Sequence, residues 1–199
     1  MTVGKFTHAI VSRVPKSFQT VATTDGSCID ILAARKQHEH LVSTLRDLGL
    51  DVLELPPDED SPLSVFVADT AVILNGVALL CRPGGGARKE DEDTIRAVIK
   101  KEIGISVVEL ENNNALLSGS DILFTGSEFF VGLGSETNTE GAVSVAQTWP
   151  EYPCTPVKLE GSRHLRDRIT LAGIDLLAVG STQNCQILLR RVEKEAMKR

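Results

Sequence analysis

The sequence predicts an α/β fold in which short β-β-α-β units stack around an axis in the manner of a propeller. A glycine-centred segment recurs at residues 73–80, 123–130 and 170–177, around Gly76, Gly126 and Gly173. Each copy is typical of a β-hairpin, because two apolar runs flank a glycine that can adopt the positive φ of a tight turn. A helical pattern follows each hairpin. Units this short cannot bury their sheets alone, so neighbours are expected to pack together with helices outside.

The first complete unit has the clearest pattern. Asn75-Gly76 is the strongest of the three turn signals. A helix is predicted over 90–103, because acidic residues crowd its start and Gly104 follows its end. One apolar stripe marks its buried face: Ile95, Val98, Ile99 and Ile103. A strand over 105–110 is expected to close the unit.

The two later units repeat this order. The second has a predicted helix over 139–147 and a closing strand over 155–159. The third ends in a predicted helix over about 182–197, with no closing strand after it. Counting an upstream unit, the sequence predicts about four units, of which the last is incomplete.

The upstream unit is predicted from one amphipathic helix and two strands. Apolar residues at three- and four-residue steps indicate a helix over 31–48, which Gly49 ends. Strands are expected over 7–14 and 51–55. A polar loop over 15–27 and an acidic, proline-rich linker over 56–62 complete this part.

Composition narrows the possible partners. The chain has 199 residues, 42% of them hydrophobic, so a single domain over residues 1–199 is expected. Its net charge of −6 argues against nucleic acid and anionic membranes. Its apolar runs are far shorter than the roughly 20 residues of a membrane-spanning helix. Because Met1 to Phe6 lack the apolar stretch of a secretory signal, a cytoplasmic location is expected.

The cysteines carry no pattern of a metal site or a disulfide. Cys28, Cys81, Cys154 and Cys185 are widely spaced and form no Cys-x-x-Cys pair. They are expected to be small buried hydrophobic residues, apart from Cys154. Cys154 lies between two prolines in a turn-like segment and is expected to be the most exposed. No metal and no cofactor are predicted.

Seven collinear segments give the chain a resemblance to a known family. These are Thr7-His-Ala-Ile10, Leu53-Glu-Leu-Pro56, Val65-Phe-Val-Ala-Asp-Thr-Ala-Val72, Arg82-Pro-Gly84, Asp121-Ile-Leu-Phe-Thr-Gly126, Glu128-Phe-Phe-Val-Gly-Leu133, and Thr137-Asn138 with Gly141-Ala142. They resemble the dimethylargininase family of guanidine-modifying enzymes, the pentein group, whose fold is a five-unit α/β propeller. The resemblance spans the whole chain and implies that the family's C-terminal quarter, with the fifth unit, is missing.

The resemblance implies a hydrolase of arginine and nitric oxide metabolism. Family members convert Nω-methylated arginine to citrulline and a methylamine, through a cysteine nucleophile and a histidine that moves protons. This chemistry requires carboxylates around the cationic guanidinium and a proton for the leaving amine. It requires no metal.

Three residues match the family's site positions. His164, in Gly161-Ser-Arg-His-Leu165, matches the catalytic histidine, although a histidine in such a loop is often simply solvated. Asp69 matches a carboxylate that binds the guanidinium; a strand-end turn residue is the alternative. Arg88 matches an arginine that holds the substrate's α-carboxylate, a role suited to a two-pronged guanidinium, or it is an unliganded charge before a helix.

Other positions depart from the family pattern. Leu63 and Ala68 stand where acidic contact residues are expected, Ser118 replaces an aspartate, and Ser127 replaces an arginine. None of the four cysteines matches the nucleophile. Loss of a covalent nucleophile typically lowers turnover by about 10⁶. The chain as written is therefore expected to be inactive.

Two functional hypotheses remain open from the sequence. The chain is either part of a longer dimethylargininase reading frame, or a non-catalytic homologue that binds an amino acid or a protein partner. A related arginine deiminase or amidinotransferase is a weaker third reading. An open fan of four units also exposes sheet edges, which predicts self-association.

Overall fold

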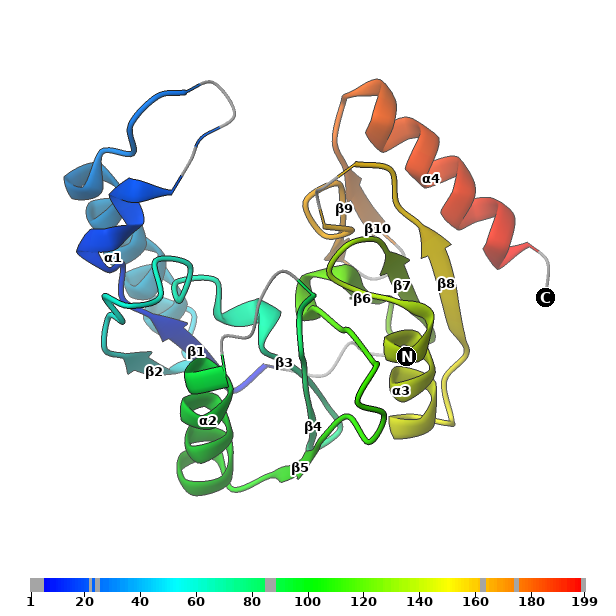
Figure 1. Cartoon of the computed structure of the whole chain (residues 1–199), viewed down its shortest axis with the longest axis horizontal. Coiled ribbons are helices and arrows are strands. Elements are labelled where there is room, and N and C mark those ends of the chain that lie inside the picture. Colours follow the sequence, from blue (N-terminus) through cyan, green and yellow to red (C-terminus); the bar gives the residue numbers. More distant parts are fainter. Residues whose placement is uncertain are drawn as a thin grey trace. The chain divides into compact units, whose positions relative to one another are not determined.

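The computed structural model describes residues 6–21, 23, 26–84, 89–161, 164–173 and 176–197. Contacts within the chain define two compact units, one ending at Val67 and the other starting at Ala68. Among the described residues, the first unit contains one sheet and the second contains three (Figure 1). No described helix is both long enough and apolar enough to cross a membrane.

The first unit is a β-α-β element. It consists of β1 (His8–Ser12), η1 (Lys16–Thr20), α1 (Ile31–Asp47) and β2 (Asp51–Leu55). β1 and β2 pair in parallel. Asp30 caps α1, since its Oδ1 accepts hydrogen bonds of 3.0 Å from the amides of Leu32 and Ala33. The predicted helix and strands are confirmed, while η1 is an unpredicted 3₁₀ turn within the expected loop.

Helix α1 is less buried than its apolar pattern predicts. Val42 is its buried residue, whereas Leu41 and Leu48 are 51% and 72% exposed. The sheet beneath it has two described strands and offers a narrower surface than the three-stranded sheets of the second unit.

The second unit opens with a complete β-β-α-β motif. It contains β3 (Ala71–Leu74), β4 (Val77–Leu80), α2 (Lys89–Val98), the π-helical turn η3 (Ile99–Ile103) and β5 (Ser106–Val108). β4 lies in the middle of the sheet, antiparallel to β3 and parallel to β5. Asn75 and Gly76 have φ values of 51° and 75°, as a primed hairpin turn requires. The predicted hairpin and helix are confirmed.

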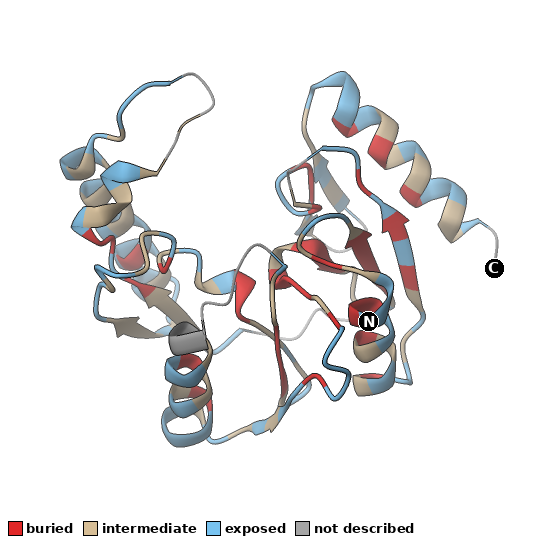
Figure 2. Cartoon of the chain, in the orientation of Figure 1, coloured by how far each residue is buried: buried red, intermediate tan, exposed pale blue. Residues whose placement is uncertain are grey.

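A second β-β-α-β motif follows with the same strand order. It contains β6 (Ile122–Phe124), β7 (Phe129–Leu133), α3 (Thr139–Thr148) and β8 (Cys154–Lys158). β7 is almost wholly buried, and Phe129 stacks on Trp149 with ring centroids 5.2 Å apart. Figure 2 shows the buried middle strand and the buried face of α3 that together form this core.

The third motif has two described strands and a helix. β9 (Ile169–Gly173) and β10 (Leu176–Val179) pair antiparallel, and α4 (Gln183–Ala196) follows them. Gly173 is the last residue of β9, so the prediction that it lies at the centre of the turn is wrong. The register of the two strands shifts between Leu176 and Leu177. Residues 174–175, which connect the two strands, lie outside the described residues.

These motifs establish a mixed α/β fold with a repeated β-β-α-β order. The described strands form separate sheets and no closed barrel. The ring of propeller units and their number stay predictions.

Candidate functional site

Asp69 lies where the 3₁₀ turn η2 (Val67–Asp69) leads into β3, and it is 9% exposed. The Ser118 hydroxyl donates a hydrogen bond of 3.2 Å to Asp69 Oδ1. Ser118 precedes the 3₁₀ turn η4 (Gly119–Asp121) and is itself buried. A glycine is needed beside it, because a Cβ on Gly119 would lie 2.0 Å from the carbonyl oxygen of Ala68.

Asp121 is the centre of the polar cluster, and it is 1% exposed. Its Oδ2 accepts a hydrogen bond of 2.7 Å from the Thr137 hydroxyl. Its Oδ1 accepts one of 3.1 Å from the backbone amide of Leu165 and lies 3.1 Å from His164 Nδ1. Both oxygens of this buried carboxylate are therefore compensated by hydrogen bonds.

Thr137 links the two carboxylates. Its hydroxyl oxygen accepts a hydrogen bond of 3.0 Å from the Ser118 amide while its proton goes to Asp121. We call the continuous path Asp69, Ser118, Thr137, Asp121 and His164 the polar network. The structure thus joins two of the three predicted site residues, Asp69 and His164. The third, Arg88, lies outside the described residues.

The charge state of His164 is set by this network. The side chain is 25% exposed, and its hydrogen bond to Asp121 raises the pKa above the ordinary histidine value. The negative charges of Asp121, Asp69 and Asp167 act in the same direction, and partial burial opposes them. The polar network therefore favours the protonated form of the imidazole.

The loop that carries His164 is anchored on both sides. The Arg166 amide donates to the Ser120 carbonyl at 3.0 Å, which ties the loop to η4. Arg168 is 8% exposed, and its Nη2 donates to the Glu160 carbonyl at 2.6 Å. These bonds place His164 over Asp121.

Cys81 offers no activated thiolate near this network. Burial raises the pKa of the Cys81 thiol far above its ordinary range, and the nearby charges of Asp69, Glu92 and Asp121 raise it further. Cys28 is exposed, whereas Cys154 is partly buried. The expectation that Cys154 would be the most exposed is wrong, because its thiol packs beside α3 and donates to the Ala142 carbonyl. The described residues contain no cluster of metal ligands.

The family departures lie in different surroundings. Ser127 occupies the β6–β7 turn, with its hydroxyl 3.4 Å from that of Thr125. Leu63 is 41% exposed in the first unit. Ser118 is the departure that belongs to the polar network.

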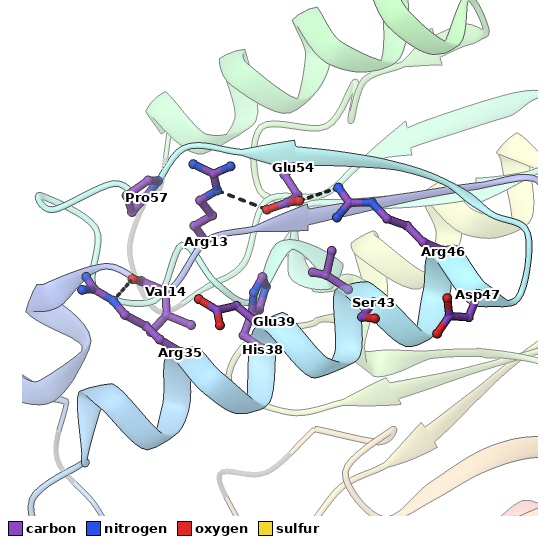
Figure 3. A pocket seen from close by; sticks show the side chains of 11 residues that line it. Arg13, Val14, Arg35, His38, Glu39, Ser43, Arg46, Asp47, Glu54 and Pro57 are labelled. Atoms are coloured by element: carbon purple, nitrogen blue, oxygen red, sulfur yellow. Dashed lines mark hydrogen bonds and ion pairs between the residues drawn. The ribbon is translucent and has the colours of Figure 1, made fainter.

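A separate pocket of about 700 Å³ lies in the first unit, between α1 and the ends of β1 and β2 (Figure 3). Glu54 forms ion pairs there with Arg13 and Arg46, which lower its pKa. Arg35 Nε donates to the Val14 carbonyl at 3.1 Å. The pocket contains none of the predicted site residues, and its arginines already bond to protein oxygens. The chemistry of the polar network makes it the stronger candidate site.

Sequence reasoning missed Asp121 and Thr137 as site residues. Both belong to segments that carry the family resemblance, but neither was assigned a role in the site. An acidic residue before a strand and a threonine before a helix are common at exposed element ends. Their burial, which identifies them, depends on contacts between distant segments.

Comparison with known proteins relates the chain to named relatives. No protein-family model matches it. Human DDAH2 is 38% identical over 194 residues, which cover 94% of this chain and 67% of that protein. The dimethylarginine dimethylaminohydrolase of Pseudomonas aeruginosa is 30% identical over 154 residues, or 76% of this chain and 60% of the enzyme.

Solved structures show the same fold. A mutant of the P. aeruginosa enzyme, complexed with citrulline, has a TM-score of 0.80 and 25% identity, covering 93% of this chain and 75% of that one. The N-terminal domain of ArgZ, a cyanobacterial arginine dihydrolase bound to its product, has a TM-score of 0.74 and 20% identity, covering 96% and 74%. With its order of motifs, its fold and these relatives, the chain belongs to the dimethylarginine dimethylaminohydrolase family.

Proposed function

We propose that this protein binds Nω-methylated arginine or a closely related amino acid at the polar network. Asp69 is the carboxylate that faces the guanidinium group, and His164 stands at the position that transfers protons in the family reaction. The observation that carries the proposal is the buried hydrogen-bonded path from Asp69 through Asp121 to His164. A buried acid and a proton-transfer group held together in this way suit a cationic ligand whose leaving amine must be protonated.

The family reaction makes these roles concrete. Hydrolysis breaks the bond between the guanidinium carbon and the methylated nitrogen, and a water oxygen becomes the ureido oxygen of citrulline. The departing methylamine takes up a proton, which His164 would deliver. The names of the bacterial relatives and the citrulline complex of the P. aeruginosa enzyme support this substrate class. Human and bovine DDAH2 are named as hydrolases with no substrate spelled out.

Arg88 is proposed to bind the α-carboxylate of the same amino acid. A guanidinium can bind a carboxylate through two parallel hydrogen bonds, which would fix the ligand's orientation. This role is supported by the family resemblance alone, because Arg88 lies outside the described residues.

For the 199-residue chain we propose ligand binding without efficient turnover. The covalent route needs a thiolate, and Cys81, beside Asp69 and Asp121, is a buried thiol held in its protonated form. Cys28 belongs to the first unit, Cys154 lies against α3, and Cys185 accepts a hydrogen bond from Thr182. Within these 199 residues, amino-acid binding is therefore favoured over turnover.

The arrangement of the units is part of the proposal. The repeated β-β-α-β motifs are taken as units of a propeller-like ring with the polar network towards its centre, as the likeness to family structures supports. The exposed edge of β10 is proposed to mediate self-association.

Calorimetry tests the binding site. Titration of the 199-residue protein with asymmetric dimethylarginine and with citrulline should give saturable heat. Asp69→Asn should remove it, because the variant lacks the charge that offsets the guanidinium. Glu151→Gln, which changes an exposed acid elsewhere, should leave it intact. Absence of heat from the wild type at millimolar ligand would overturn the proposal.

Turnover is tested separately by citrulline formation from dimethylarginine. The wild type and His164→Gly should both remain at the background rate. A wild-type rate well above that of His164→Gly would show that the chain has a working nucleophile, and would overturn the non-catalytic part of the proposal.

A further inference from the structure

Asp121 is held more firmly than an acid at a strand end needs to be. It is 1% exposed, and partners reach it from two separate segments: Thr137, and the adjacent residues His164 and Leu165. Burying a carboxylate is costly unless each oxygen is hydrogen bonded, and here both are. The position of the carboxylate relative to the His164 loop is therefore tightly fixed.

The hydrogen bond to His164 determines which ring nitrogen faces outward. Asp121 Oδ1 lies 3.1 Å from Nδ1, and a carboxylate can only accept a hydrogen bond. Nδ1 must therefore carry the proton in the neutral ring, so that Nε2 has the free lone pair. The same Oδ1 also holds the amide of Leu165, the residue after His164, so ring and backbone share one anchor.

We propose that Asp121 is the positioning residue of His164: it holds the ring with Nδ1 towards the protein interior and leaves Nε2 as the atom that faces the ligand. The inference deepens the proposed function, on which it rests for the nature of that ligand. Asp121 itself touches no ligand atom in this account. Its effect is transmitted through the ring that it orients.

Ser118 has a different partner in the polar network from Asp121. The family resemblance leads one to expect an aspartate at position 118, but a serine is present and hydrogen bonds to Asp69. The Ser118 hydroxyl donates to Asp69 and accepts from the Ser120 amide, and it adds no third negative charge to the cluster. Among the described acids, Asp121 is the one that hydrogen bonds to the His164 ring.

The charges around the His164 ring allow the effect of the Asp121 hydrogen bond to be separated from the effect of electrostatic attraction. Asp121, Asp69 and Asp167 all favour the protonated imidazole, and partial burial opposes them. Asp121 alone of these acts through a side-chain hydrogen bond to the ring, whereas Asp167 acts by its charge and is exposed. Asp167→Asn is therefore a matched control for Asp121→Asn.

The test is nitrogen NMR of the full chain labelled with ¹⁵N-histidine, recorded without ligand across pH 5 to 9. In the wild type, the neutral His164 ring should carry its proton on Nδ1. Asp121→Asn should lower the pKa of His164 and increase the fraction of the ring with its proton on Nε2. Asp167→Asn should lower the pKa without changing the proton's position, and Asp121→Glu should restore part of the wild-type behaviour.

Two results would overturn the inference. One is a wild-type ring that carries its neutral proton on Nε2, which requires no variant to detect. The other is a folded Asp121→Asn protein whose ring is indistinguishable from that of Asp167→Asn. Should Asp121→Asn fail to fold, Thr137→Val gives the same readout, with Thr137→Ser as the restoring variant. Since no ligand is present, a failure of amino-acid binding would leave this result unaffected.

Discussion

Thr137 is the residue on which the two halves of the polar network depend. Its hydroxyl donates to Asp121 Oδ2 and accepts from the Ser118 amide, and the side chain is inaccessible to water. A serine could make both bonds, but valine, of nearly the same shape, could make neither. The polar network therefore depends on a hydroxyl oxygen at position 137, and not only on the volume of the side chain there.

Thr137→Val should destabilise the protein measurably. It leaves a buried carboxylate oxygen and a buried amide without this partner, at a cost of about 1 to 3 kcal/mol for each unsatisfied group. Urea unfolding followed by circular dichroism measures the loss. Thr137→Ser should recover most of it, and equal stability of the valine variant and the wild type would contradict the network.

The raised pKa of His164 predicts a pH dependence of stability. A pKa higher in the folded than in the unfolded state means that the folded protein binds the extra proton more tightly. This contribution is fully present below the unfolded value of about 6.5 and disappears as pH rises through the higher folded value. The wild type should therefore exceed His164→Gln in stability by more at pH 5.5 than at pH 8.

Urea unfolding of both proteins at these two pH values measures that difference. Taking the difference removes the contributions of the other titrating groups that the two proteins share. A stability difference between the two proteins that is unchanged, or larger at pH 8, would show that the folded state does not favour the protonated His164 ring.

At the scale of single residues, the sequence indicated candidate site residues only where their neighbours in the chain form a recognisable motif. His164 and Asp69 could be singled out as candidates because each lies in a segment with a recognisable order of residues. Asp121 and Thr137 could not, because their role comes from burial against Leu165 and Ser118, which are distant in sequence. The proposed contact of Arg88 stays a prediction.

At the scale of single helices, strands and turns, the residue types at each position predicted most of the local structure. The Asn75-Gly76 turn formed where two residues of positive φ were required, and Gly104 ended η3 with a φ of 74°. Gly173 lies in β9, where it pairs with Leu176, and the register of the two strands shifts between Leu176 and Leu177. Sequence periodicity cannot reveal such a shift, which arises from pairing between strands.

The close approach of η4 to η2 gives a prediction at this scale. Gly119→Ala would place a Cβ 2.0 Å from the Ala68 carbonyl oxygen, a backbone atom that cannot easily move away. The two turns must separate, at a cost of about 1 to 3 kcal/mol or more, and the Ser118–Asp69 bond should weaken with them.

Thermal unfolding of Gly119→Ala, with Gly134→Ala as the control, checks this expectation. The nearest atom to a Cβ on Gly134 lies 3.7 Å away, an ordinary contact distance. Gly134→Ala should therefore remain close to wild type. Equal melting temperatures for the two variants would argue against the close packing of the turns.

At the scale of the whole molecule, the third motif differs from the two complete ones. The middle strands β4 and β7 are largely buried, whereas β10, which holds the same place in its motif, alternates between exposed and half-buried residues. Leu176 is 59% exposed. Within the described residues, β10 pairs with β9 only, so one of its edges is open to another strand.

Self-association should follow from this edge. Sedimentation velocity at increasing protein concentration should show a growing fraction of dimers or larger species. Leu176→Lys adds a charge to the apolar edge and should shift the distribution towards the monomer. A wild-type protein that remains a clean monomer at high concentration would refute this prediction.

The sequence predicted the strands within each motif better than it predicted contacts between segments that are distant in the chain. The repeat predicted which strands form each motif, and the pairing of β3 to β8 confirmed it. The division into two compact units and the low burial of α1 could not be predicted, because helix periodicity does not show how wide a sheet lies beneath the helix.

The most direct test of the central claim, that the polar network is the site of an arginine-like ligand, is an NMR titration of the chain with asymmetric dimethylarginine. The account predicts saturable changes at the His164 ring and at the amides of Ser118 and Leu165. It also predicts that these changes disappear in Asp69→Asn. Saturable binding that leaves all three signals unchanged, or that survives in Asp69→Asn, would place the ligand elsewhere and contradict the account.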